Sequence, residues 1–143
     1  MERKFELLEH RADAYIASYG RTLQEAFENA GLALFEVMTD TRHVEPRIED
    51  TIEVEGHDEQ SLLYNWLEHL LVKFEVDGKL YSKFKILNIE KKGEKLKLKA
   101  KIFGEDFKPE KHLQKVGVKA VTYHLMEIKK EPQKVTLKFL LDL

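Results

Sequence analysis

The residues best suited to chemistry stand at the end of the chain. Asp142 is followed by Leu143, so an aspartate side chain and a terminal carboxylate are one residue apart on a strand of alternating pattern. These groups offer several hard oxygen ligands, and a third acidic group nearby would complete a site for a divalent cation such as Ca²⁺ or Mg²⁺. The alternative, which the spacing alone favours, is a solvated aspartate at a frayed terminus.

A second candidate is the segment that contains His10 and Asp13. Asp13 stands where a turn enters a strand, and a histidine three residues earlier could serve as a neighbouring acid or base. Aspartate is also common in turns for the different reason that it bonds backbone N–H groups there. Nothing in the periodicity indicates that Asp13 meets Asp142.

Two further segments carry charge in a regular pattern. Alternation places Lys119 and Tyr123 on one strand face, where they could bind an anion or a partner's carboxylate; a half-buried strand whose lysine reaches water is the more frequent case. Lysines at 95, 97, 99 and 101 form a row that could follow phosphates or meet an acidic partner. For this row we favour a solubilising face, which also protects an edge strand.

The elements that must position these residues follow from the hydrophobic periodicity. Two amphipathic helices are predicted, one opened by a capping box at Thr22 and Glu25 and one capped by Asp58. The predicted strands are 5–8, 13–19, 47–55, 84–91, 94–103, 116–129 and 134–143. This order predicts an α+β fold for residues 1–143 as a single domain: a two-layer sandwich with both helices on one face of a mainly antiparallel sheet.

The composition excludes several classes of protein. The chain has no cysteine, which rules out disulfides, thiolate zinc sites and a cysteine nucleophile. A formal net charge of −2 argues against binding driven by phosphate neutralisation over the whole surface. No apolar run is long enough to cross a bilayer and the first residues lack a signal-peptide core, so we expect a cytoplasmic protein without a membrane partner.

Four segments, taken together, resemble the archease family. They are residues 5–13, similar to the family's His-Thr-Ala-Asp motif, residues 62–71 with Trp66, residues 118–124, and the ending 140–143. The resemblance spans the chain in order, spacing and length. One departure is Arg11, which stands where the family usually has threonine, so a hydroxyl able to bond the turn or a metal-bound water is missing.

The resemblance implies a protein that is not itself an enzyme. Archeases promote guanylylation and multiple turnover of the RtcB-type RNA ligase, which joins 2′,3′-cyclic phosphate (or 3′-phosphate) and 5′-hydroxyl RNA ends in tRNA splicing. The family pattern implies a metal site at Asp13, Asp142 and Leu143, with Ca²⁺ expected and Mg²⁺ or Mn²⁺ as alternatives. His10, Lys119 and Tyr123 are then expected to support the site or to face the partner, and RNA is met only through the ligase.

Two other readings of the same residues stay open. A metal-dependent phosphoester hydrolase would use the acidic cluster to activate water, with His10 or His124 as proton acceptor. A chaperone-like module for nucleic-acid enzymes would instead use the sheet surface and the lysine row. The sequence does not give the metal, the oligomeric state, the docking surface or the effect of Arg11.

Overall fold

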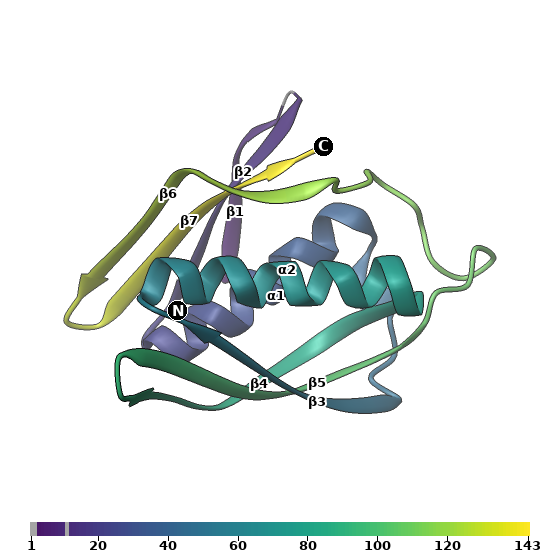
Figure 1. Cartoon of the computed structure of the whole chain (residues 1–143). Helices are drawn as coiled ribbons and strands as arrows, with labels where there is room; N and C mark the ends of the chain where they lie inside the picture. Colours follow the sequence, from purple (N-terminus) through teal and green to yellow (C-terminus); the bar gives the residue numbers. More distant parts are fainter. Residues whose placement is uncertain (1–2, 11) are drawn as a thin grey trace.

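Two helices lie between two antiparallel β-sheets (Figure 1). The computed structural model describes residues 3–10 and 12–143, without the side chains of Glu9 and His10. The four-stranded sheet has the order β1-β2-β7-β6 and the three-stranded sheet the order β3-β5-β4. The strands are β1 (Phe5–His10), β2 (Asp13–Gly20), β3 (Ile48–Gly56), β4 (Lys79–Lys92), β5 (Lys95–Asp106), β6 (Ala120–Glu131) and β7 (Lys134–Asp142).

Both helices begin at the predicted caps. In α1 (Leu23–Met38), Thr22 accepts the N–H of Glu25 at 3.1 Å, while the Glu25 carboxylate accepts the N–H of Arg21. Asp58 and Ser61 form a complete capping box at the start of α2 (Glu59–Asp77), which ends at Gly78 in the left-handed region, where glycine is favoured. Neither helix in the described ranges has the length and apolar character needed to span a membrane.

The core is one cluster shared by the helices and both sheets. α1 packs against β2 and β4, and α2 packs against β3 and β6. Trp66 of α2 is fully buried and donates its indole N–H to the Phe27 carbonyl of α1 at 2.9 Å. The bond offsets the desolvation of the buried indole N–H, and it orients the two helices relative to each other.

The α+β class with two amphipathic helices and antiparallel strands is confirmed, and the structure adds a second sheet. Residues 48–106 supply the three-stranded sheet with α2 inside that stretch, whereas the four-stranded sheet combines the first two strands with the last two. The apolar stripe of α1 is broad enough to bury residues against both sheets. β4 begins at Lys79, earlier than predicted, and β6 begins at Ala120, later than predicted.

Candidate functional site

The first residue of β2 lies opposite the last residue of β7. Asp13 and Asp142 are direct partners in the antiparallel register. The Leu143 N–H donates to the Ala12 carbonyl at 3.1 Å, which makes Asp13 and Asp142 the non-hydrogen-bonded kind of pair. In such pairs the Cα atoms are about 4.5 Å apart and the side chains come closest. The structure therefore brings together two residues that the periodicity left unconnected and that only the family resemblance had paired.

The two aspartates share the face of the sheet that points away from the helices. Ser18, on the opposite face of β2, is buried and donates its hydroxyl to the Ala26 carbonyl of α1. Because side chains alternate along a strand, Asp13 and Tyr15 must point outward, and the register gives Asp142 the same direction. Figure 1 shows this end of β7 beside the β1–β2 hairpin. The acidic pair is thus open to a partner.

The donor set at this position suits a hard divalent cation. Two carboxylates and the main-chain oxygens of Leu143 are all oxygen ligands, which Ca²⁺, Mg²⁺ and Mn²⁺ accept and which soft metals do not prefer. The Asp142 carbonyl accepts the Lys119 N–H at 2.7 Å, so the side chain of Asp142 is the group left for a ligand. Like charges directly opposite each other in a sheet are destabilising, and a shared cation would offset that cost.

The other predicted site residues are placed in three different ways. Lys119 is exposed and adjoins Asp142 through its main-chain bond. Tyr123 lies on the helix-facing side, where its ring stacks on Tyr64 of α2 with centroids 4.4 Å apart, yet it is 51% exposed. The side chain of His10 and the whole of Arg11 lie outside the described residues. The structure thus leaves Lys119 near the acidic pair and Tyr123 on the other face.

An irregularity in β6 lies beside the acidic pair and was not predicted from the sequence. Thr122 pairs with Leu140 and Glu127 pairs with Lys138, so residues 123–126 face Phe139 alone. We call residues 123–126 the β6 bulge. Leu125 in the β6 bulge has φ 60°, and it is the one non-glycine residue with a positive φ in the described ranges. A left-handed conformation costs a side chain such as leucine about 1–2 kcal/mol.

A buried polar cluster joins the end of β5 to two loops, and it too was missed. The Glu105 carboxylate accepts the Glu45 N–H at 2.7 Å and approaches Lys111 Nζ at 2.8 Å and His112 Nε2 at 3.1 Å. Nδ1 of His112 accepts the Lys108 N–H, so Nε2 carries the proton. Every polar atom of the buried Glu105–His112 pair has a partner, which indicates a structural role.

The lysine row is paired with glutamates. Lys95, Lys97 and Lys101 lie 3.6–3.8 Å from Glu55, Glu53 and Glu49 of β3, respectively. β5 is the central strand of its sheet, so the prediction that the lysine row protects an edge strand is wrong. These lysines and glutamates form the charged, solubilising face that the sequence favoured, but on a central strand instead of an edge strand.

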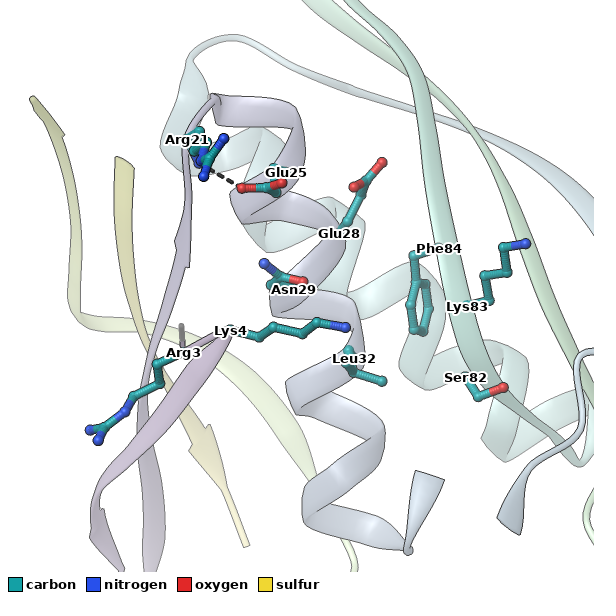
Figure 2. Close-up of a pocket in the computed structure, with 10 residues that line it drawn as sticks. All are labelled: Arg3, Lys4, Arg21, Glu25, Glu28, Asn29, Leu32, Ser82, Lys83 and Phe84. Atoms are coloured by element: carbon teal, nitrogen blue, oxygen red, sulfur yellow. Dashed lines mark hydrogen bonds between the residues drawn. The ribbon is translucent and has the colours of Figure 1, made fainter. Parts of the chain in front are cut away.

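A polar groove of about 470 Å³ is lined by α1, by β4 and by residues 3–4 ahead of β1 (Figure 2). Its two carboxylates are occupied by main-chain groups, since Glu25 accepts the Arg21 N–H at 2.7 Å and Glu28 accepts the Ile86 N–H at 2.9 Å. Burial raises the pKa of Glu28. Arg21 follows the last residue of β2, so the groove lies at the opposite end of that strand from Asp13. Glu28 thus ties α1 to the edge strand β4, and Glu25 belongs to the N-terminal cap of α1.

Comparison with known proteins gives matches along nearly the whole chain. The model of the Archease protein family matches residues 5–143. A protein archease from Sulfurisphaera tokodaii is 47% identical over 141 residues, covering 99% of both chains, and one from Pyrococcus furiosus is 48% identical over 130 residues, covering 91% of both. The solution structure of Methanobacterium thermoautotrophicum protein 1598 has a TM-score of 0.85 and 44% identity, covering 98% of this chain and 99% of that one.

Proposed function

This chain belongs to the archease family, and on that premise we propose that it activates an RtcB-type RNA ligase. It acts as a protein cofactor in the cytoplasm and joins no RNA itself. It promotes guanylylation of the ligase and lets the ligase turn over repeatedly while joining 2′,3′-cyclic phosphate (or 3′-phosphate) ends to 5′-hydroxyl ends. RNA reaches it only through the ligase.

The observation that carries the proposal is the register of Asp13 with Asp142 at the outward-facing end of the four-stranded sheet. Asp13, Asp142 and Leu143 would hold a divalent cation, with Ca²⁺ preferred by an all-oxygen set and Mg²⁺ or Mn²⁺ as alternatives. A divalent ion neutralises charge on a phosphoryl group that is being transferred.

The residues of this chain hold the site rigidly. Asp13 and Asp142 stand on neighbouring strands whose main chains are bonded on both sides of β7, by Ala12 and by Lys119. A site on regular strands keeps its side chains in a fixed geometry better than a site on loops. Lys119, exposed next to Asp142, is suited to meet a phosphate or a carboxylate of the partner.

The test is an assay of covalent ligase–GMP with purified ligase, GTP and a divalent ion, with and without this protein. We expect faster guanylylation and more RNA-joining events per ligase when it is present. The proposal fails if the rate is unchanged. Turnover of RNA or nucleotide by this protein in the absence of the ligase would instead favour the phosphoester hydrolase.

A further inference from the structure

The β6 bulge is held in one conformation although its side chains reach solvent. The Tyr15 hydroxyl donates to the Leu125 carbonyl at 3.0 Å, and the His124 N–H donates to the Thr122 hydroxyl at 3.0 Å. Tyr123 is braced against Tyr64. Even so, Tyr123 is 51% and Leu125 is 55% exposed. A fixed backbone that presents half-exposed apolar side chains is prepared for contact without a large loss of conformational entropy.

The β6 bulge lies close to the acidic pair. Tyr15, which holds Leu125, is two residues from Asp13 on the same face of β2, and it lies opposite Leu140, two residues from Asp142. Two residues along a strand span about 7 Å. Leu140 is only 8% exposed although it is on the outer face. Tyr123 faces the helices and the acidic pair faces outward, but β6 is an edge strand of its sheet, so a partner that covers this edge can contact both.

The charges around the β6 bulge indicate what that partner is. Burial, followed by the carboxylates of Asp58 and Glu68, raises the pKa of Tyr123. Glu127 directly follows the β6 bulge, opposite Lys138 of β7. Lys119 and Lys138 lie in the same surroundings. The carboxylates of Asp58, Glu68 and Glu127, added to the acidic pair, outnumber these two lysines, and the excess of negative charge repels the phosphates of RNA. Complementary charge favours a protein surface with basic side chains.

We propose that the β6 bulge is the docking element of this protein, with Tyr123 and Leu125 entering an apolar pocket that basic side chains surround on a folded protein partner. Under the proposed function, on which this inference rests, the partner is the RNA ligase. Docking of the β6 bulge aims the acidic pair at the partner's surface. An exposed leucine in the left-handed region is explained by this role, because the conformation serves contact with the partner.

The test compares the binding of variants to the ligase by titration calorimetry. Leu125→Asn removes the apolar side chain and keeps a residue that tolerates positive φ. Leu113→Asn is the matched control, since Leu113 is 58% exposed in the loop before β6. Tyr123→Ala removes the aromatic anchor. We expect Leu125→Asn and Tyr123→Ala to raise Kd about tenfold or more and Leu113→Asn to leave it unchanged.

A second measurement separates docking from the acidic site. At concentrations that saturate the ligase with each variant, Leu125→Asn should stimulate guanylylation like the wild type, whereas Asp142→Asn should fail to stimulate. Wild-type affinity for Leu125→Asn would overturn the docking role and leave the proposed function standing. RNA binding that Leu125→Asn abolishes would overturn the choice of a protein partner. A wild type that neither binds nor stimulates the ligase would overturn both proposals.

Discussion

Asp13 and Asp142 face each other across neighbouring strands as a non-hydrogen-bonded pair, the type in which opposite side chains come closest. This places two like charges in the closest arrangement that an antiparallel sheet allows. Such a pair is costly without a cation, and at the proposed metal site a bound cation would make it favourable. The first predictions follow from that change of sign.

Ca²⁺ should raise the melting temperature of the wild type and not that of Asp142→Asn. In excess EDTA, the variant should be as stable as the wild type or more stable by about 0.2–1 kcal/mol, because one of two opposed charges is gone. Thermal unfolding followed by circular dichroism, with and without the ion, measures both effects. Equal stabilisation of wild type and variant by Ca²⁺ would show that the ion binds elsewhere.

Asp13→Asn and Asp142→Asn should keep the fold and lose stimulation of guanylylation. Asparagine preserves the shape of the side chain and removes the charge that a hard cation needs. Covalent ligase–GMP formed per minute is the measurement. Glu53→Gln is the control, because Glu53 is an exposed carboxylate on the outer face of the other sheet. If both aspartate variants activate normally, the metal-site mechanism is wrong.

Glu105 should give the protein a stability that depends on pH. Burial alone would raise its pKa, but bonds from the Glu45 N–H, Lys111 and His112 lower the pKa from 4.5 to about 2. A lowered carboxyl pKa contributes stability that is present above the unfolded value and lost as pH falls through the folded value. We expect a loss of about 3 kcal/mol between about pH 5 and pH 2.

Glu105→Gln isolates this contribution. The variant should be less stable than the wild type at pH 7, and the difference in urea midpoint should shrink as the pH falls toward 2, because the wild-type carboxylate is then protonated. A difference that is independent of pH would mean that packing, and not charge, accounts for the role of Glu105.

Gly104→Ala should be destabilised by about 3 kcal/mol. A Cβ at position 104 would lie 1.8 Å from the Leu80 carbonyl oxygen, which is main chain and cannot turn away. Gly117→Ala is the matched control, because nothing lies within 4 Å of its added Cβ and its change should be under about 0.5 kcal/mol. Urea unfolding of both variants checks the contrast; equal effects would mean that β5 shifts to relieve the overlap.

Charge reversal in the lysine row should matter little for function. In the double variant Lys97→Glu and Lys99→Glu, the ion pair of Lys97 with Glu53 is lost and two carboxylates repel each other instead. This should lower stability by about 1 kcal/mol. Stimulation of the ligase should stay within about twofold of the wild type. Loss of stimulation would favour the chaperone-like module that binds through this row.

The sequence predicts local elements well because their signals are local. Thr22, Asp58 and Gly78 set the ends of the helices, and the hairpin at Gly93 has the expected left-handed glycine. The register of Asp13 with Asp142 depends on pairing between β2 and β7, which stand near opposite ends of the chain. No periodicity within either strand determines which strand is its neighbour, and only the family resemblance connected them.

The missed features have no pattern of their own in the sequence. The β6 bulge begins where Tyr123 follows Thr122, and the residues there alternate as in a regular strand, so its extra residues are invisible before the pairing is known. His112 has no ligand spacing, and its role follows only from a carboxylate that a neighbouring strand delivers. The second sheet was missed because the alternation along a strand shows which face is apolar but not which sheet the strand joins.

The position of β7 between β2 and β6 affects how a newly made chain matures. β7 is the last strand to be synthesised, and it supplies the fully buried Leu137, Phe139 and Leu141. Before it emerges from the ribosome, β2 and β6 lack a shared neighbour, and the helices lack part of the layer that covers them. A product that stops short of β7 would therefore hold neither a closed core nor the second aspartate. Under the proposed function, its ability to engage the ligase would depend on translation having reached Asp142.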